Sequence, residues 1–334
     1  MPTRNPIVDS FGRVHTNLRI SVTDRCNIRC FYCMPAEDVE FRPRHELLTF
    51  EEITRFVSVA ATMGVDRLRI TGGEPLVRAE IPSLVRMLSS TAGIKDVALT
   101  TNGILLDEAA GDLFKAGLTR LNVSLDTLDE ATFRHISRRA GLQRVLDGIF
   151  AARSAGFEKI RLNALAIRDL TEKEIVPLAE FAREHDLELR FIEYMPLDAA
   201  GSWQSKQVLR GAEIAAILTD AFGPLEPVDR PDPSQPAIDY RFADGRGRIG
   251  FINPVSEPFC GDCNRLRLTA DGQVRNCLFS SNEWDARTVL RRADSTDDEL
   301  AELIYASVAA KQPGHGIDSP EFLKPQRAMY QIGG

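Results

Sequence analysis

The sequence predicts an α/β fold, an incomplete (β/α)6 barrel of the TIM type with a C-terminal antiparallel extension. Six strand-like segments alternate with amphipathic segments up to about residue 192, short alternating segments follow beyond residue 239, and the cysteines form two separate groups. Alternating strands and helices are typical of a parallel sheet with crossover connections. Eight such units would close a barrel, so six leave it open. Periodicity does not distinguish this barrel from a doubly wound open sheet.

The predicted helices have start and stop signals in the sequence. Residues 49–52 read Thr-Phe-Glu-Glu, a capping box, and apolar residues follow at helical spacing up to Gly64. Residues 171–174 repeat this pattern, so we expect a second capped helix there. Strands are predicted at 18–23, 67–71, 96–100, 120–124, 160–166 and 188–192, and further helices at 106–116 and 295–311.

A segment with five prolines, residues 224–236, divides the chain. We predict a barrel domain at 1–223 and a C-terminal region at 224–334. Short antiparallel strands are predicted in this region at 240–242, 248–252, 265–269 and 273–277. A two-residue turn at Asp271-Gly272 would pair Cys277 with Leu266, on the opposite face from Cys263. Bringing these two cysteines together would therefore require a bulge or twist.

Composition is that of an ordinary soluble protein, with 334 residues, 43% hydrophobic and 27% charged. No apolar run approaches the ~20 residues that cross a membrane, and residues 1–8 lack a signal-peptide core. We therefore expect a cytoplasmic protein that does not bind membranes. The net charge of −7 argues against nucleic-acid binding. Any anion site would need a local group of arginines.

All six cysteines belong to two triads, and such clustering in a reducing compartment favours metal over disulfides. The first triad has the spacing C-x3-C-x2-C directly after the first strand, and its members are Cys26, Cys30 and Cys33. Three thiolates can hold three irons of a [4Fe–4S] cluster and leave the fourth open to another ligand. Zinc, a disulfide with a spare thiol, or unrelated core cysteines are the alternatives. Zinc usually takes paired C-x2-C units, and the nearest histidines lie outside the loop.

The second triad lies in the C-terminal extension and again has no fourth cysteine. Its members are Cys260, Cys263 and Cys277. We expect a second [4Fe–4S] cluster with an open iron here. A three-Cys zinc site completed by His or Asp is the alternative.

Glycines and small polar residues follow three of the predicted strands, where parallel α/β folds bind their ligands. Residues 71–75 read Thr-Gly-Gly-Glu-Pro, and paired glycines let a backbone approach a ligand closely. Residues 100–103 and 122–126 place hydroxyl and amide groups that could bind ribose or carboxylate oxygens. Ordinary turn and capping roles are the alternative.

Five arginines are predicted around one end of the sheet. Arg265 and Arg267 alternate along one strand face, so both guanidinium groups could clamp phosphate oxygens. Arg19, Arg69 and Arg161 lie on strands that lead toward the same rim. Each alone would be read as a solvated surface group. Together, in an acidic protein, they predict a polyanionic substrate such as a nucleoside triphosphate.

The first triad, with Tyr32 before its last cysteine, and the Gly-Gly-Glu-Pro motif resemble the signature of radical S-adenosylmethionine (SAM) enzymes. Both triads, with Arg265-Leu266-Arg267 between the later cysteines, closely resemble the GTP 3′,8-cyclase family of molybdenum cofactor biosynthesis. This resemblance covers nearly the whole chain. It implies that the first cluster binds SAM and that the open iron of the second cluster binds the guanine of GTP.

The resemblance also implies roles for individual residues. The implied SAM contacts are Tyr32, Gly72, Gly73, Glu74, Ser124 and Met195. The implied GTP contacts are Arg19, Arg69, Thr100, Arg161, Arg265, Leu266 and Arg267. The implied catalytic group is Cys26, Cys30, Cys33, Arg265, Arg267 and the terminal Gly333 and Gly334, which would enter the active site. The family usually has Lys at the position of Arg161, so the charge is kept but the geometry is not.

The implied reaction begins with reductive cleavage of SAM to a 5′-deoxyadenosyl radical, which takes hydrogen from C3′ of GTP. The C3′ radical attacks C8 of guanine, and reduction gives a cyclic dihydro-GTP. The implied partners are cyclic pyranopterin monophosphate synthase, which acts next, an electron donor, and a second copy in a homodimer.

Two rival functions remain open from the residues. A radical SAM peptide maturase with an auxiliary cluster would be expected to have a peptide-binding domain ahead of the barrel, and about 17 residues precede the first strand. A non-catalytic iron–sulfur or zinc scaffold would leave the Gly-Gly-Glu-Pro motif and the arginines unexplained.

Overall fold

One mixed sheet of 12 strands organises the chain in a computed structural model, which describes residues 4–317, 319–320 and 322–333. The strand order is β12-β11-β10-β1-β2-β3-β4-β5-β6-β9-β8-β7. From β1 to β6 each strand pairs in parallel with the next. These strands are β1 (Asn17–Ser21), β2 (Arg67–Thr71), β3 (Asp96–Thr101), β4 (Arg120–Ser124), β5 (Ile160–Ala166) and β6 (Glu188–Glu193). The predicted α/β class and all six strands are confirmed.

The C-terminal extension adds strands to both edges of this sheet. At one edge β9 (Arg248–Ile252) pairs in parallel with β6, and at the other β10 (Arg265–Leu268) pairs in parallel with β1. The antiparallel ladders lie outside these two strands, and they comprise β7 (Leu225–Pro227), β8 (Ile238–Phe242), β11 (Gln273–Arg275) and β12 (Trp284–Asp285). The prediction of a purely antiparallel extension is therefore wrong. Apolar residues alternate in the same way in parallel and antiparallel strands. The sequence pattern therefore could not predict the two parallel pairings.

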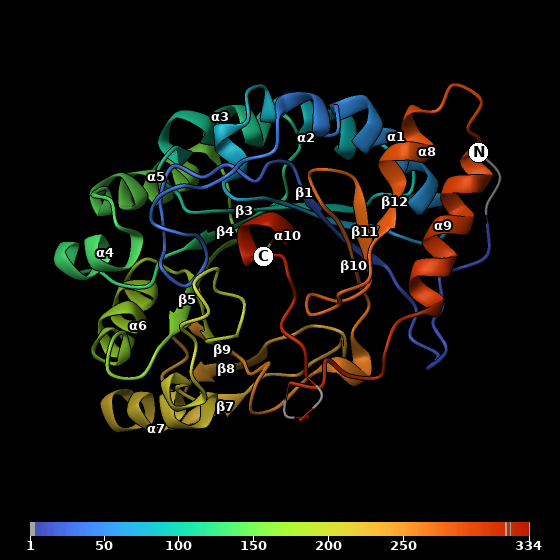
Figure 1. Ribbon diagram of the computed structural model, residues 1–334. Coiled ribbons are helices and arrows are strands. Elements are labelled where there is room, and N and C mark those ends of the chain that lie inside the picture. Colours follow the sequence, from blue (N-terminus) through green and yellow to red (C-terminus); the bar gives the residue numbers. More distant parts are fainter. Residues whose placement is uncertain (1–3, 318, 321, 334) are drawn as a thin grey trace.

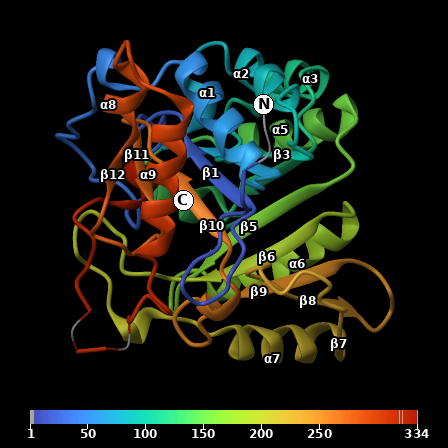
Figure 2. The ribbon, with the colours of Figure 1, turned by 90° about the vertical axis from the view of Figure 1, so that its right-hand side faces the viewer.

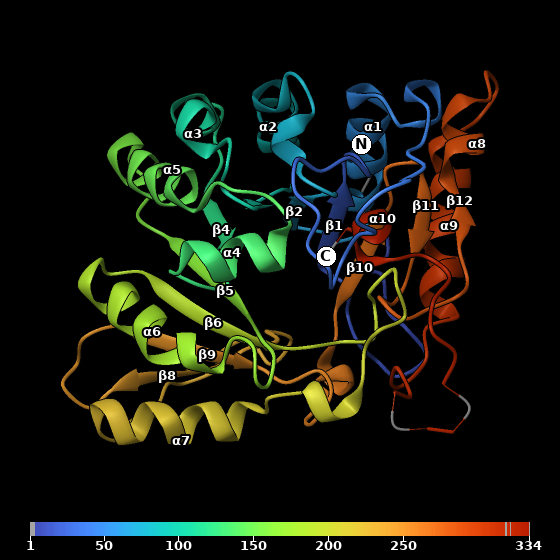
Figure 3. The same ribbon diagram turned by 60° about the vertical axis from the view of Figure 1, so that its left-hand side comes forward.

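The sheet is strongly curved, and most of the helices lie along its outer side (Figures 1 and 3). The helices of the βα units are α1 (Phe50–Thr62), α2 (Ile81–Ser89), α3 (Leu106–Lys115), α4 (Glu130–Ser137), α5 (Leu142–Ala155), α6 (Ile175–Glu184) and α7 (Gly211–Phe222). Short 3-10 turns occur at Arg44–Glu46, Pro75–Val77, Glu172–Glu174, Ser205–Gln207 and Cys260–Asp262.

Three further helices belong to the C-terminal part of the chain. They are α8 (Ala286–Arg291), α9 (Asp297–Ala309) and α10 (Met329–Ile332). Helices α8 and α9 pack beside α1, as Figure 2 shows. The short α10 lies inside the curve of the sheet, far from the outer helices (Figure 1). In the described part of the chain, no helix combines the length and the apolar character needed to cross a bilayer.

The two predicted capping boxes have different outcomes. At α1 the box is confirmed: the Thr49 hydroxyl accepts from the Glu52 N–H at 3.2 Å, and the Glu52 carboxylate accepts from the Thr49 N–H at 2.7 Å. At residues 171–174 it is wrong. There the Thr171 hydroxyl accepts from the Ile167 N–H and the Glu174 carboxylate from the Leu128 N–H. Both side chains are buried and serve neighbouring segments instead of their own helix.

The β10–β11 hairpin has a three-residue turn. Thr269 N–H donates to the Gln273 carbonyl at 2.9 Å, and Gly272 has φ +82°, a left-handed conformation that suits glycine. Arg267 lies opposite Arg275 and Leu268 opposite Val274, whereas a two-residue turn would put Leu268 opposite Arg275. The register that would pair Cys277 with Leu266 is therefore wrong by one residue. The ladder ends at Arg275, so Cys277 follows β11 outside it.

Candidate active site

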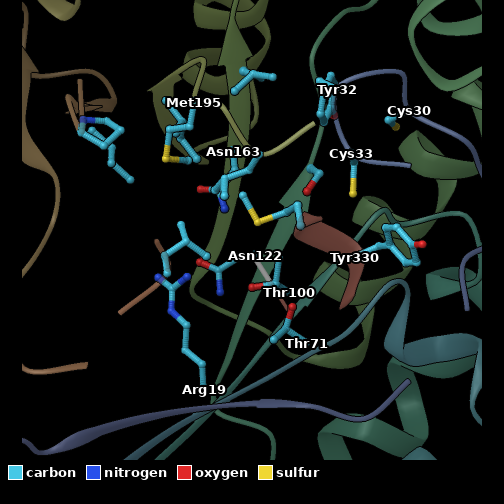
Figure 4. A pocket seen from close by; sticks show the side chains of 18 of the residues that line it. Arg19, Cys30, Tyr32, Cys33, Thr71, Thr100, Asn122, Asn163, Met195 and Tyr330 are labelled. Atoms are coloured by element: carbon cyan, nitrogen blue, oxygen red, sulfur yellow. The ribbon is translucent and has the colours of Figure 1, made fainter. Parts of the chain in front are cut away.

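A cavity of about 330 Å³ lies inside the curve of the sheet, at the carboxyl ends of the parallel strands. All six cysteines of the two triads line it, as do most of the residues predicted to bind SAM or GTP. Figure 4 shows several of these side chains around the cavity, including Arg19, Tyr32, Thr100 and Met195. The predicted residues that line the cavity are Arg19, Tyr32, Arg69, Gly72, Gly73, Glu74, Thr100, Ser124, Met195, Arg265 and Arg267.

The first triad lies on the loop after β1, and this loop is held by backbone hydrogen bonds. Cys33 N–H donates to the Cys30 carbonyl at 2.9 Å, which makes a tight turn between these two cysteines. Arg29 and Phe31 donate their N–H groups to the last residues of α4. All three thiols are free. The loop therefore presents three sulfur ligands toward one space.

Gly72 and Gly73 are required because the first triad's loop passes directly over them. Gly73 N–H donates to the Thr23 carbonyl at 2.7 Å. A Cβ atom on Gly73 would lie 2.4 Å from the Arg25 carbonyl oxygen, and one on Gly72 would lie 2.6 Å from that of Thr23. Only glycine fits at such a distance, so the motif fixes the loop against β2.

The Glu74 carboxylate connects two neighbouring strand ends. It accepts from the Thr101 hydroxyl at 2.7 Å, the Asn102 N–H at 2.6 Å and the Leu76 N–H at 3.0 Å. Burial raises the pKa of Glu74 to about 7, although these hydrogen bonds favour the ionised form. Asn102 in turn donates to the Asn27 side chain at 2.7 Å. Glu74 thus orders the rim of the cavity beside the first triad.

The Tyr32 hydroxyl donates to Asp126 at 2.6 Å, and Asp126 also accepts from the Leu165 N–H at 2.8 Å. This pair joins the first triad's loop to the ends of β4 and β5. The Thr100 hydroxyl, which also lines the cavity, is buried and has no hydrogen-bond partner among the described residues. It is therefore free to bind a polar ligand.

The two triads differ in their electrostatic surroundings. Burial raises the pKa of the Cys26 thiol to about 11 and that of Cys33 to about 12. Burial acts in the same direction on Cys263, but the charges of Arg265 and Lys311 outweigh it and lower its pKa to about 6. The Cys263 sulfur lies 3.3 Å from the Arg265 guanidinium and 3.6 Å from the Lys311 ammonium. Lys311 was not predicted, because 48 residues separate it from Cys263.

Arg19 and Arg69 line the cavity without an acidic partner within ion-pair distance in the described part of the chain. Burial and the neighbouring Arg267 and Arg265 lower the pKa of Arg19, while burial and Arg19 lower that of Arg69. These guanidinium groups thus repel one another across the cavity. A polyanionic ligand would relieve this repulsion.

Two predicted GTP contacts lie elsewhere. Arg161 pairs with Glu188 and does not line the cavity. The Leu266 side chain is fully buried in the hydrophobic core. Arg190, which was not predicted, lines the cavity and contacts Asp239 at 3.3 Å. Arg190 lies in a predicted strand, but the sequence does not show which face of the sheet its side chain occupies, so its place in the cavity was not predicted.

The chain's C-terminal end returns to the cavity. The Gly333 carbonyl accepts a hydrogen bond from the Arg267 guanidinium. Gly333 has φ +83°, and a Cβ atom there would lie 2.9 Å from Ser21 and Thr71 side-chain atoms. Gly334 lies outside the described residues. Gly333 does not itself line the cavity, but its carbonyl contacts Arg267, which does.

The residues present fit an iron–sulfur cluster and SAM. Three free thiols on one loop match the sulfur ligands that such clusters take. No three His, Cys, Asp or Glu side chains among the described residues are arranged to hold a single metal ion. Gly72 and Gly73, which the loop approaches closely, line the same cavity as the thiols. So does the Thr100 hydroxyl, which has no partner among the described residues.

Comparison with known proteins matches two family models, the radical SAM superfamily at residues 20–182 and molybdenum cofactor synthesis C at residues 187–317. A GTP 3′,8-cyclase of Rhodopirellula baltica is 56% identical, covering 98% of this chain and 92% of its own. One from Mycobacterium sp. (strain KMS) is 44% identical, covering 100% and 95%. The structure of Streptococcus suis SuiB bound to SAM is similar in fold, with a TM-score of 0.63, 16% identity and coverage of 89% of this chain and 68% of that one.

The curved parallel sheet, the first triad and the matching model define a radical SAM protein. The identity to the relatives, which extends through the second triad, is more specific. The chain belongs to the GTP 3′,8-cyclase family.

Proposed function

We propose that this protein converts GTP into (8S)-3′,8-cyclo-7,8-dihydroguanosine 5′-triphosphate, the first step of molybdenum cofactor biosynthesis. The observation that carries the proposal is that one cavity brings both cysteine triads together with Arg19 and Arg69, which have no acidic partner among the described residues. A radical SAM protein needs only the first triad. The second triad and the arginines are the additional features that a purine nucleoside triphosphate would use.

The arginines account for the triphosphate. Arg19, Arg69 and Arg267 line one part of the cavity, and a guanidinium group can donate two parallel hydrogen bonds to a phosphate. Arg190 and Arg265 also line the cavity, and Asp239 pairs with Arg190. The guanidinium groups repel one another in the free site, and a bound tetra-anion would relieve this repulsion. The binding free energy would therefore be more favourable than at isolated surface arginines.

The first triad would hold a [4Fe–4S] cluster, and the Gly72-Gly73 backbone and Met195 would contact SAM beside it. When bound and reduced, the cluster and SAM supply a 5′-deoxyadenosyl radical. The protein's own residues orient the ribose and exclude water. On GTP the C3′–H bond would break with its hydrogen passing to 5′-deoxyadenosine, a C3′–C8 bond would form, and one electron and one proton would complete the 7,8-dihydro ring. A second electron, also from the electron donor, would be used to cleave SAM.

Several finer assignments belong to the same proposal. The second triad would hold a second [4Fe–4S] cluster, with the open iron facing the guanine. The curved sheet would be an incomplete barrel, with a domain boundary at residues 223 and 224. The match to molybdenum cofactor synthesis C at residues 187–317, which includes all three cysteines of the second triad, supports the second cluster.

The proposal includes partners and a compartment. The product would pass to cyclic pyranopterin monophosphate synthase, an electron donor would reduce the clusters, and two copies would form a homodimer. The cytoplasm is the proposed location, because reducing conditions preserve free thiols and oxygen-labile clusters.

An anaerobic turnover experiment tests the proposal. Iron-reconstituted protein with SAM and a reductant should consume GTP and give a product of the same mass at a new retention time, without the guanine absorbance. ATP is the matched control and should give no such product. If GTP is recovered unchanged from protein that cleaves SAM, the proposed substrate is wrong.

A further inference from the structure

Residues 322–333, which we call the tail, run past the first triad's loop to Arg267 on β10. Met329 and Tyr330 line the cavity, and Tyr330 packs with Met34 against the first triad's loop. Three residues later, the Gly333 carbonyl accepts from Arg267, on the strand that precedes the second triad's hairpin turn. The tail therefore contacts both halves of the site.

Arg327 anchors the start of this crossing with a fork of four contacts to two carboxylates. Its two terminal nitrogens donate to the Asp271 carboxylate at 3.0 and 2.9 Å. One of them also donates to Glu283 at 2.8 Å, and the Nε atom lies 2.7 Å from the other Glu283 oxygen. The side chain is 17% exposed, and Asp271 is 8% exposed. Only the planar guanidinium can serve both carboxylates in this way.

The two carboxylates are themselves fixed to the β10–β11 hairpin. Asp271 lies in the turn of this hairpin, and its carboxylate also accepts a hydrogen bond from the Thr269 hydroxyl at 2.6 Å. Glu283 pairs with Arg275 on β11. The hairpin that receives Arg327 thus also carries Arg267 and leads to Cys277. Consequently the tail is attached to one hairpin at two points, with the single turn of α10 between them.

We propose that Arg327 is a positioning residue that sets the tail, and through Gly333 the Arg267 guanidinium, for substrate binding. Arg327 does not line the cavity, so it acts through other groups. Because both ends of the α10 turn are held, the Gly333 carbonyl stays at one position. The Arg267 guanidinium, which donates to this carbonyl, therefore keeps one orientation toward the cavity. Without Arg327 the start of the turn loses its attachment to the hairpin and keeps only the Met329 N–H bond to the Leu197 carbonyl at 3.2 Å and the packing of Ala328 and Tyr330 against Met34. The part of this inference that concerns GTP rests on the proposed function.

Hydrogen exchange and GTP binding test the inference on the full-length protein. In Arg327→Gln, amides 328–333 should exchange at least about tenfold faster, while amides of β2 to β4 keep their rates. The affinity for GTP should fall about tenfold, and SAM binding should be retained. Arg327→Lys should recover part of both effects, since it restores charge without the fork.

Arg292→Gln is the matched control, because Arg292 also contacts two carboxylates, Asp294 and Glu299, but lies on the surface. It should change neither measurement. If Arg327→Gln raises exchange throughout the sheet, Asp271→Asn is the milder test, since it leaves the Arg327–Glu283 contacts in place. Asp271→Asn should then show the tail effect alone.

Unchanged tail exchange in these variants would overturn the inference, as would faster tail exchange with unchanged GTP affinity. The exchange measurement needs no ligand. Failure of the wild-type protein to bind GTP would therefore count against the proposed function, while the tail measurement would still judge the anchoring role of Arg327.

Discussion

Gly73 illustrates how much of the site depends on single atoms. The first triad's loop passes so close that a Cβ atom would lie 2.4 Å from a backbone oxygen that cannot move independently. Sequence identified this glycine because the motif is local. What it could not give is the reason, which is the passage of residues 23–25 over the end of β2.

Gly73→Ala should therefore weaken SAM binding at least about fivefold, since overpacking typically costs about 1–3 kcal/mol. Titration of SAM into reconstituted protein measures this. Gly111→Ala is the matched control, because Gly111 lies in α3 with no atom within 4 Å of an added Cβ. It should leave SAM binding unchanged and stabilise the helix by about 0.5–1 kcal/mol. Equal SAM affinity in the two variants would contradict the role of Gly73.

Cys263 should be the reactive thiol of the metal-free protein. With a pKa of about 6 it is a thiolate at pH 7.5, whereas Cys26, with a pKa of about 11, is still protonated. Alkylation of Cys263 should rise with pH and be half-maximal near pH 6. Mass spectrometry of labelled peptides measures this under anaerobic conditions.

Lys311→Gln should shift the same curve to higher pH, because it removes one of the two cations that lower the pKa of Cys263. If wild-type Cys263 reacts only above about pH 8, like an ordinary thiol, then the two cations do not act as the geometry indicates.

At the scale of elements, the β10–β11 hairpin determines how the second triad comes together. Its three-residue turn sets the register in which Arg267 lies opposite Arg275, two residues before Cys277. Sequence located the turn correctly but not its length, and one residue of register reverses every side chain. The edge pairings of β9 and β10 were also out of reach, because each depends on a strand more than 50 residues away.

Gly272→Ala should disturb this hairpin and lower the iron content of reconstituted protein toward that of one cluster. An added Cβ would lie 2.6 Å from the Arg287 side chain, in addition to the left-handed backbone cost of about 1–2 kcal/mol. Iron analysis and electron paramagnetic resonance measure the clusters.

Gly245→Ala is the control for Gly272→Ala. Gly245 has φ +75° and no atom within 4 Å of an added Cβ, so it carries the same backbone strain without the clash. It should keep full iron content. Equal iron in both variants would show that the hairpin turn does not set the second triad.

At the scale of the whole molecule, the site is assembled from both ends of the chain. Cys26 and Gly73 come from local motifs, so sequence predicted them. Arg190 and Lys311 acquire their roles only through folding, so sequence did not. The approach of the tail to the site was expected from the resemblance alone. Its anchor is the contact between Arg327 and Asp271, which lie 56 positions apart in the sequence.

Arg267→Ala should weaken GTP binding about tenfold or more, because charged hydrogen bonds contribute about 1.5–3 kcal/mol each. It removes a positive charge from the cavity and also the donor that holds Gly333. SAM affinity is the internal control and should change little. Equal GTP affinity in wild type and variant would contradict the assignment of Arg267 to the triphosphate.

In the proposed reaction, a 5′-deoxyadenosyl radical formed in this cavity takes hydrogen from C3′ of GTP. Anaerobic turnover of the reconstituted protein with GTP deuterated at C3′, followed by mass spectrometry of 5′-deoxyadenosine, tests it most directly. Deuterium is expected in the 5′-deoxyadenosine. Unlabelled 5′-deoxyadenosine, formed at the same rate with or without GTP, would contradict it and leave a radical SAM protein with another substrate.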